Sequence, residues 1–391
     1  MERIGIYGGS FNPPHIGHVS AAAWAVDVLG LSKMLVIPCN ISPGKPDSET
    51  GVSNQQRLEM LQLSIDGQDK LEVCQMELHR GGVSYTCDTI LDLRQKYPEQ
   101  ELVLCMGSDA FAHFEDWKDI DTIIQNASLA VFYRGKRSDD TAQVQARLET
   151  MGAKIYVVDN PVTQISSTQL RRLLAFQCAS PFLHPAVEIY IQSNGLYGTD
   201  RDLRNLPMAE LESVVVSLLK PNRVAHVLGC RDTAVEMAKR WGADETDAAR
   251  AGILHDITKA LDGPLQLTLC SEYGIILDKF SESNPKTLQA LTGSLVAERI
   301  FGENKAVVDA IRWHTTGKAN MNLLQKIIYV ADYMEPNRDF PGVEQLRHLA
   351  FTDIDGALQL GLEMTLSMLR EQGREISPES QQALAWLNQK K

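Results

Sequence analysis

The sequence predicts two domains: an α/β domain with a Rossmann-like parallel sheet over residues 1–198, and an all-α domain over residues 203–391. In the first half, short apolar runs alternate with helical runs, a pattern typical of a parallel sheet with helices on both faces. After residue 198 the strand-like runs almost disappear and helical periodicity takes over. The segment NGLYGTDRDLRNLP, at 194–207, is rich in Gly, Asn and charge and is expected to be the linker.

Each expected element follows from its local pattern. Strands are expected at the apolar runs 3–9, 33–39, 71–77, 101–107, 128–134 and 154–159. Helices are expected between them, at 15–30, 53–65 and 85–97, and the first and last of these end at Gly30 and Pro98. In the second half, helical periodicity dominates residues 209–220, 223–241, 246–261, 286–301, 304–314, 321–335 and 353–370.

Composition limits the function classes. A chain of 391 residues is long enough for two domains with real cores. Its net charge of −12 argues against a general nucleic-acid binder. Its seven scattered cysteines suit a reducing compartment, and its apolar runs are shorter than the roughly 20 residues that a membrane helix needs. We therefore expect a cytoplasmic protein that binds neither nucleic acid nor membrane; homo-oligomerisation is left open.

The turn after the first strand, GGSFNPPHIGH, predicts an anion site. Gly8 and Gly9 precede a helix, whose free N–H groups and dipole favour a bound anion. His15 and His18 are three positions apart, so both imidazoles share one face of the first turn. There they could stabilise phosphoryl oxygens as charge builds up in a displacement. Taken alone, the motif could equally be a Pro/Gly turn with two surface histidines.

A second phosphate-type element, ISSTQLRR at 165–172, strengthens this interpretation. Ser166, Ser167 and Thr168 offer hydroxyl groups at a helix start, and Arg171 lies one turn in, facing the same anion. Alone it would be a capped helix with a solvated arginine. Together the two elements predict a site for nucleotide phosphates at the carboxyl edge of the sheet.

Both motifs resemble the paired signatures of the HxGH nucleotidyltransferase superfamily. SYTCDTILDLR (84–94) and GSDAFAHFEDWKDIDTII (107–124) narrow the resemblance to bacterial nicotinate-nucleotide adenylyltransferase, over nearly all of residues 1–198. The resemblance implies a step of NAD biosynthesis in which nicotinate mononucleotide attacks the α-phosphorus of ATP directly. The products would be nicotinate adenine dinucleotide and pyrophosphate, and Mg²⁺ would accompany the ATP phosphates.

The resemblance also implies roles for single residues. His15 and His18 would be catalytic and polarise the α- and β-phosphates. ATP and its phosphates would be bound by Gly8, Gly9, Ser10, Lys45, Ser166, Ser167, Thr168 and Arg171. The nicotinate nucleotide would be bound by Thr86, Gly107, Ser108, Asp109 and, through stacking, Trp117.

Two points qualify this resemblance. Gly44 stands where the family often has a histidine before the loop lysine, and the loss of that donor would weaken ATP binding. Trp117 taken alone would be an ordinary half-buried core tryptophan. Phosphopantetheine or nicotinamide mononucleotide is the alternative acceptor, and the SYTCDT and WKD segments argue against both.

The second half holds a different set of chemical groups. His226, the adjacent pair His255 and Asp256, His314 and Asp332 all lie in helical patterns. Imidazole and carboxylate together suit Fe, Mn, Zn or a similar divalent ion, which could generate hydroxide and clamp a phosphate. The His-Asp pair alone is a weak signal, because adjacent residues of a helix do not share a face. The whole set on separate helices is much stronger.

The second half resembles the HD superfamily, and most of all the bacterial symmetrical bis(5′-nucleosyl)-tetraphosphatase, over about residues 209–370. The segments that carry the resemblance are RVAHVLGCRDTAVEMAKRWGAD, ARAGILHDITK and HTTGKANMNLLQKIIYVADYMEPNRDFPGVEQLR. It implies hydrolysis of diadenosine tetraphosphate to two ADP, with Asp256 catalytic. The metal ligands would be His226, His255, Asp256 and Asp332, with His314 on a second metal, and Lys259, Asn337 and Arg338 would meet phosphate.

One departure bears on the second metal. In QALTGSLVAERIFG (289–302), Thr292 stands where the family has another histidine. Threonine is a poor ligand for a borderline divalent ion, which argues against the second metal. The leading interpretation is a bifunctional enzyme. The alternative is an adenylyltransferase with a degenerate HD domain that binds nucleotide and regulates.

Overall fold

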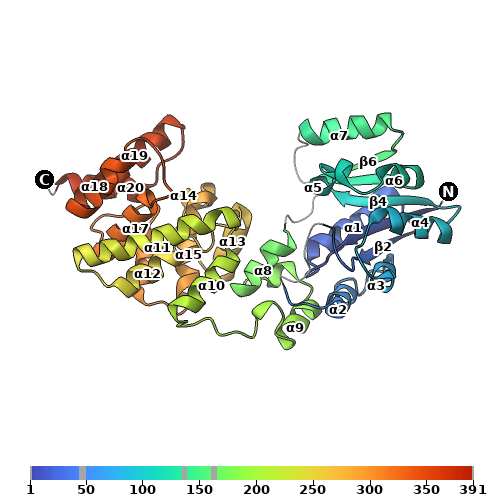
Figure 1. Ribbon diagram of the computed structural model, residues 1–391, viewed down its shortest axis with the longest axis horizontal. Coiled ribbons are helices and arrows are strands. Elements are labelled where there is room, and N and C mark those ends of the chain that lie inside the picture. The colour runs from blue at the N-terminus through green and yellow to red at the C-terminus, as the bar shows by residue number, and fades with distance from the viewer. Residues whose placement is uncertain (1, 44–49, 134–138, 160–164, 390–391) are drawn as a thin grey trace. The chain divides into compact units, whose positions relative to one another are not determined.

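The computed structural model describes residues 2–43, 50–133, 139–159 and 165–389. It divides into two compact units, Met1–Arg201 and Asp202–Lys391. Figure 1 shows the first as a sheet with helices around it and the second, over its described residues, as helices alone. This is the α/β and all-α combination that the sequence predicts. None of the described helices has the length and the hydropathy needed to cross a membrane.

The sheet of the first unit is entirely parallel, with the strand order β3–β2–β1–β4–β5–β6. The strands are β1 (Arg3–Gly9), β2 (Lys33–Pro38), β3 (Leu71–Val73), β4 (Glu101–Gly107), β5 (Ser128–Tyr133) and β6 (Ile155–Asp159). The helices are α1 (Ile16–Leu29), α2 (Asn54–Ser64), α3 (Met76–Arg80), α4 (Thr86–Lys96), α5 (Ser108–Phe111), α6 (Ile120–Asn126), α7 (Asp139–Thr150), α8 (Ser167–Ala175) and α9 (Pro185–Ser193).

Alternating side chains of the central strands fill two cores, one on each face of the sheet. Ile4 and Ile6 of β1 join the core that α4, α6 and α7 cover. Val103 and Cys105 of β4 point the other way, into the core that α1 covers. Because both faces are covered, these strands are continuously apolar, as their sequence pattern indicates.

The strand order places a switch point between β1 and β4. From β1 the chain proceeds outward to β2 and β3, and from β4 it proceeds in the opposite direction to β5 and β6. The carboxyl ends of β1 and β4, at Gly9 and Gly107, are therefore neighbours whose following loops diverge. Open parallel sheets bind ligands in the crevice that such divergence leaves.

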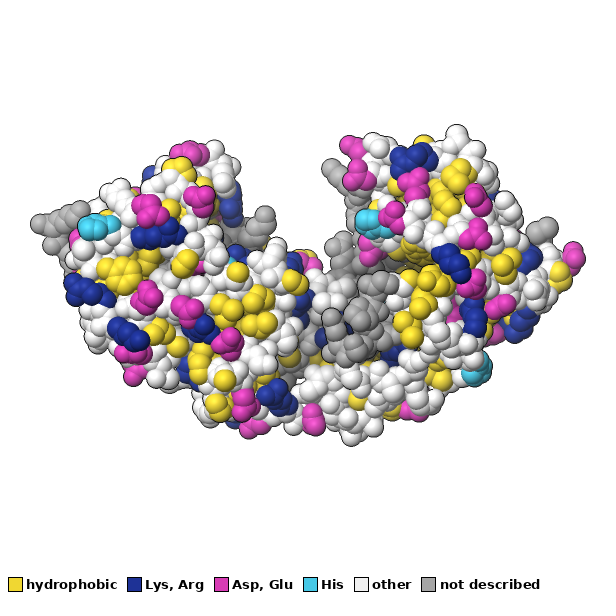
Figure 2. Space-filling view, in the orientation of Figure 1, with side chains coloured by type: hydrophobic (Ala, Val, Ile, Leu, Met, Phe, Trp, Pro, Cys, Tyr) yellow, Lys and Arg dark blue, Asp and Glu magenta, His cyan; other side chains and the backbone are white. Residues whose placement is uncertain are grey.

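The second unit is built from helices of different lengths. They are α10 (Met208–Leu218), α11 (Pro221–Trp241), α12 (Glu245–Leu254), α13 (Gly263–Glu272), α14 (Lys279–Ser283), α15 (Leu288–Arg299), α16 (Lys305–Trp313), α17 (Leu323–Met334), α18 (Val343–Thr352), α19 (Ile354–Glu371) and α20 (Pro378–Gln389). The two helices α11 and α12 approach closely at Gly252, where a Cβ would lie 2.8 Å from the Cα of Arg231. On the visible face of each unit, basic and acidic side chains are interspersed (Figure 2).

Two expected elements are shorter than the sequence pattern indicated. The strand expected at 71–77 ends at Val73, and Met76 begins α3. It pairs with β2 on one side, and after the Cys74 N–H has donated to Val36 O at 2.9 Å the chain leaves the sheet. The helix expected at 246–261 ends at Leu254. The reason is local. The His255 ring is 2.7 Å from the Gly252 carbonyl, which in a longer helix would accept from the backbone N–H of Asp256.

One half-buried carboxylate joins four strands at the amino edge of the sheet. Glu101, at the start of β4, accepts hydrogen bonds from Lys154, Ser128, Tyr156 and Arg3, at 2.6, 2.8, 2.9 and 3.1 Å. Burial by itself raises the pKa of Glu101, but these hydrogen bonds outweigh it and lower the pKa to about 2. The ionised form is therefore favoured in the folded state.

We predict that this carboxylate makes sheet stability depend on pH. Its pKa in the folded chain lies below its usual 4.5, so its contribution is complete above about pH 4.5 and is lost as the pH falls toward 2. Between pH 6 and pH 3, the unfolding free energy should fall by about 2 kcal/mol more in the wild type than in Glu101→Gln. Urea titration monitored by hydrogen exchange of β4 and β5 peptides measures this difference.

The matched control is Glu72→Gln, which removes an exposed carboxylate paired with Lys33 at 2.9 Å. That variant should follow the wild-type pH profile. Parallel profiles for Glu101→Gln and the wild type would contradict the prediction.

Candidate functional sites

The first candidate site lies at the carboxyl end of β1. Gly8 and Gly9 are the last residues of that strand, and a Cβ on Gly8 would meet no atom within 4 Å, so the backbone there borders open space. The loop that follows is held by Arg57 of α2, a fully buried side chain. Its guanidinium donates to the carbonyls of Ser10 and Cys39, at 2.6 Å each. Arg57 thus fixes the loops after β1 and β2 to each other.

His15 and His18 lie together at the start of α1, on the shared face that their spacing predicts. Their rings stack with centroids 3.5 Å apart and planes 22° from parallel. The Nδ1 of His15 accepts from the His18 backbone N–H at 3.3 Å, and the Nδ1 of His18 accepts from the His15 backbone N–H at 3.2 Å. An accepting Nδ1 carries no proton, so in the neutral ring the proton is on Nε2. Both rings are therefore fixed as Nε2–H donors.

The start of α8 packs against the same loop. Ser166 caps the helix by accepting from the Gln169 N–H at 3.2 Å. Ser167 donates to the Pro13 carbonyl at 2.9 Å, and Arg171 donates to the Asn12 carbonyl at 2.7 Å and to Thr168 at 3.2 Å. The structure thus brings together the two phosphate-type motifs, which are about 150 positions apart in the chain.

The residues predicted for the nicotinate nucleotide lie at β4 and α4. Gly107 is the last residue of β4 and the N-cap of α5, and Ser108 and Asp109 are the first two residues of α5. Thr86 is the first residue of α4, and Trp117 is half-buried with its ring 5.2 Å from that of Phe114. Lys118 is 3.5 Å from Asp88 of α4, so the Trp117 segment and the start of α4 are neighbours. Lys45 lies outside the described residues, as does Gly44.

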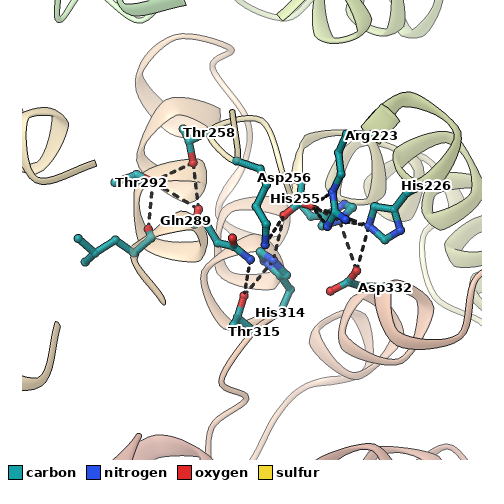
Figure 3. A network of polar contacts seen from close by, with 12 residues as sticks. Arg223, His226, His255, Asp256, Thr258, Gln289, Thr292, His314, Thr315 and Asp332 are labelled. Atoms are coloured by element: carbon teal, nitrogen blue, oxygen red, sulfur yellow. Dashed lines mark hydrogen bonds and ion pairs between the residues drawn. The ribbon is translucent and has the colours of Figure 1, made fainter. Parts of the chain in front are cut away.

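The second candidate site is a cluster of imidazoles and carboxylates in the second unit (Figure 3). His226 of α11 places its Nε2 3.2 Å from the Nε2 of His255 and 3.1 Å from an Asp332 oxygen. The His255 Nε2 is 3.6 Å from the same Asp332 oxygen. These three ligand atoms lie within 4.8 Å of one another, close enough to hold one metal ion.

Hydrogen bonds on the far side of each ring orient these imidazoles. The Nδ1 atoms of His255 and His314 are each 2.7 Å from a backbone carbonyl, that of Gly252 and that of Ile311. The Nδ1 of His226 is 3.0 Å from a Glu335 carboxylate oxygen. Carbonyl and carboxylate oxygens only accept, so each Nδ1 carries a proton, and in the neutral ring each Nε2 presents a lone pair.

The donor set fits a divalent cation. The lone pairs of His226 and His255 face each other at 3.2 Å, which is repulsive unless a cation lies between them and Asp332. Burial, followed by the neighbouring His255, lowers the pKa of His314 to about 4, so this ring is neutral at pH 7, as a ligand must be. Asp256 Oδ1 is buried without a hydrogen-bond partner, 3.8 Å from the His314 Nε2. The orphaned oxygen is a further donor that a cation would satisfy.

His255 and Asp256 both reach the cluster because α12 ends before them, at Leu254. The expectation that both residues lie inside a helix is therefore wrong. Adjacent residues of a helix point to different faces, but His255 and Asp256 lie in the turn after the helix, where both side chains can reach the cluster. His314 likewise follows the last residue of α16, while His226 and Asp332 lie within α11 and α17.

Cationic side chains surround the two aspartates. Arg223 donates to Asp256 through Nε at 2.7 Å, and the Lys259 Nζ is 3.9 Å from the other oxygen of Asp256. Arg338 donates to the Asp332 side chain at 2.7 Å. Burial by itself raises the pKa of Asp256, but the neighbouring His255 and Lys259 outweigh it and lower the pKa to about 2. This carboxylate is ionised at neutral pH.

Asn337, expected to meet phosphate, has its amide engaged within the protein. It donates to Glu335 at 2.8 Å and to the Ala225 carbonyl at 3.1 Å. It therefore orients the carboxylate that in turn orients His226. Glu335 and Arg223 were not predicted from the sequence; each lies three positions from a predicted ligand, Glu335 after Asp332 and Arg223 before His226.

Thr292 of α15 lies at the far end of the polar network drawn in Figure 3. The network reaches it from His314 through Thr315 and Gln289. The Thr292 hydroxyl is 2.8 Å from that of Thr258 and bonds to the Gln266 side chain and, at 3.0 Å, to the Leu288 carbonyl. It is not part of the ligand group formed by His226, His255 and Asp332 among the described residues. The hydroxyl is thus used in packing α15 against neighbouring segments.

Known proteins resemble the two parts of the chain separately. The cytidylyltransferase-like family matches residues 6–173, and the HD domain family matches residues 223–337. A symmetrical bis(5′-nucleosyl)-tetraphosphatase from Halalkalibacterium halodurans is 40% identical over 184 residues, which are 44% of this chain and 94% of that protein. A probable nicotinate-nucleotide adenylyltransferase from Borreliella burgdorferi is 34% identical over 197 residues, 50% of this chain and 96% of that protein.

Among solved structures, a predicted HD superfamily hydrolase involved in NAD metabolism, from Clostridium acetobutylicum, is 34% identical. The match covers 48% of this chain and 99% of that one, with a TM-score of 0.47.

We predict that Glu335 strengthens metal binding without being a ligand. Glu335→Gln keeps the shape of the side chain and removes the charge behind the His226 ring, so metal affinity should fall by about 10- to 100-fold. Competition of Mn²⁺ with a chelator measures the affinity. The control is Glu344→Gln, an exposed carboxylate that pairs with Arg347. Equal Mn²⁺ affinities in the two variants would contradict a role for Glu335.

Proposed function

This chain belongs to the cytidylyltransferase-like family over residues 6–173 and to the HD domain family over residues 223–337, and from this premise we propose that it is a bifunctional enzyme. The domain at 1–198 would transfer adenylyl from ATP to nicotinate mononucleotide, giving nicotinate adenine dinucleotide and pyrophosphate. The domain at 203–391 would hydrolyse diadenosine tetraphosphate symmetrically to two ADP. The observation that carries the proposal is the opposite protonation of the imidazoles in the two units.

For the first reaction, the proposal rests on converging donors. The Nε2–H groups of His15 and His18 would donate to the α- and β-phosphate oxygens, whose charge grows as the acceptor phosphate attacks. Gly8, Gly9 and Ser10 would border the phosphates, and the α8 start with Arg171 would hold the departing pyrophosphate. Lys45 would add a charge to the same end. Mg²⁺ would neutralise the ATP phosphates.

The acceptor would bind at the β4 side of the switch point. Thr86, Gly107, Ser108 and Asp109 would hold nicotinate mononucleotide, and Trp117 would stack on its ring. The similarity to the probable nicotinate-nucleotide adenylyltransferase from Borreliella burgdorferi supports this acceptor. A panel that includes phosphopantetheine and nicotinamide mononucleotide separates it from the alternatives.

For the second reaction, His226, His255, Asp256 and Asp332 would hold the metal, which supplies a hydroxide near neutral pH and a clamp for a phosphate oxygen. Lys259, beside Asp256, and Arg338, beside Asp332, would bind the negatively charged polyphosphate. His314 would contribute its Nε2 next to Asp256. The similarity to the symmetrical bis(5′-nucleosyl)-tetraphosphatase from Halalkalibacterium halodurans supports diadenosine tetraphosphate as the substrate. The cysteines, all within the described residues, form no disulfide with one another, which supports a cytoplasmic enzyme.

A second candidate is a regulatory HD domain that binds nucleotide without hydrolysing it. The engagement of Thr292 with Thr258 and Leu288 favours it, because this hydroxyl adds no ligand for a second metal. The two candidates differ in metal content and in turnover.

We predict that two substitutions separate the two activities. Asp256→Ala should reduce ADP release from diadenosine tetraphosphate by about 100-fold or more and leave adenylyl transfer intact. His18→Ala should reduce adenylyl transfer by about 100- to 1,000-fold and leave hydrolysis intact, because it removes one donor to the transition state. Both activities are measured on one Mn²⁺-loaded sample. Working adenylyl transfer without any ADP release in the wild type would favour the regulatory candidate.

We further predict one tightly bound metal per chain, since the ligand group of His226, His255 and Asp332 offers one compact site. Elemental analysis of dialysed, Mn²⁺-loaded protein measures the ratio, and His255→Ala should bring it close to zero. Two metals per chain would show that Thr292 does not prevent the second site. No bound metal in the wild type would exclude a metallohydrolase.

A further inference from the structure

A cavity of about 540 Å³, lined only by residues of the second unit, opens beside the cluster of imidazoles and carboxylates. Two of its lining residues are also neighbours of the cluster. The Lys259 Nζ is 3.9 Å from Asp256, and the Thr315 hydroxyl is 3.1 Å from the His314 Nε2. The cavity therefore adjoins the cluster at Lys259 and Thr315.

The walls of the cavity combine apolar surface with amide and hydroxyl groups. Phe280, Met368 and Leu369 supply apolar surface, and the Met368 side chain lies at the surface with 42% exposure. Asn284 and Gln289 supply amides near them. Such a mixture suits a ligand with a flat apolar part and several polar edges.

Hydrogen bonds tie the walls to each other. Asn284, after α14, donates to Glu375 at 2.9 Å, and Ser380 of α20 donates to the Thr316 carbonyl at 2.7 Å. The wall from Thr365 to Ser380 lies outside residues 223–337, which the HD family matches.

We propose that the cavity binds the nucleoside end of the hydrolysed substrate, with the base between Phe280 and Met368 and the phosphates leading past Lys259 to the cluster. A volume of about 540 Å³ is within the range of small-ligand sites and large enough for one nucleoside. The residues at 365–380 would then determine which nucleoside is accepted. The inference rests on the proposed hydrolase for the identity of the substrate, but the pocket itself is testable without turnover.

The test is photolabelling of the full-length, Mn²⁺-loaded chain with 8-azidoadenosine 5′-diphosphate, followed by mass spectrometry of the labelled peptides. The wild type should be labelled on peptides that contain residues 280–289 or 365–380. Met368→Trp fills the cavity mouth and should reduce this labelling by about tenfold. The control Ile276→Trp makes a similar change at a side chain of the same unit that is 97% exposed and does not line the cavity. It should be labelled like the wild type.

Labelling of the first unit shows in every sample that the probe is active. The inference is overturned if the second unit is labelled only outside the cavity walls, or if Met368→Trp is labelled as strongly as Ile276→Trp. Cavity labelling in a chain that releases no ADP from diadenosine tetraphosphate would support the pocket and reject the hydrolase. ADP release without cavity labelling would support the hydrolase and reject the pocket.

Discussion

The chemistry of both units depends on what lies behind each imidazole. In the first unit, the Nδ1 atoms of His15 and His18 accept from backbone N–H groups, so Nε2 keeps the proton and donates. In the second unit, the Nδ1 atoms of His226 and His255 bond to oxygen acceptors, so Nε2 presents a lone pair. The same side chain thereby offers an N–H donor in one fold and a lone pair in the other.

The two folds reach these arrangements by different routes. A parallel sheet supplies a switch point, where the ends of β1 and β4 are adjacent and their loops separate. The starts of α1 and α8 then meet at the same edge, where Ser167 donates to the Pro13 carbonyl of the loop before α1. The helical unit uses helix ends instead. His255 and His314 follow the last residues of α12 and α16, where the chain turns and the rings are released from helical directions.

Local pattern was sufficient for most of the elements but not for their ends. Strand β3 is short because it lies at the sheet edge and the chain leaves after one more bond to β2. Helices α13, α14 and α18 lie outside the helical ranges expected from the sequence, and short helices of this kind owe most of their stability to packing against other helices. The buried Arg57 sits in an otherwise ordinary helical pattern, and nothing local indicates that it fixes two loops.

The sequence by itself determined the two fold classes, their order and the residue types of both sites, because periodicity and short motifs are local properties of the chain. Tertiary structure alone decided the roles that depend on distant partners. Glu335 meets His226 across 109 positions, and Asn337, expected at phosphate, is instead bound to Glu335. Orientation of the His226 ring follows from a hydrogen bond between two elements, and only the packed helices bring that partner within reach.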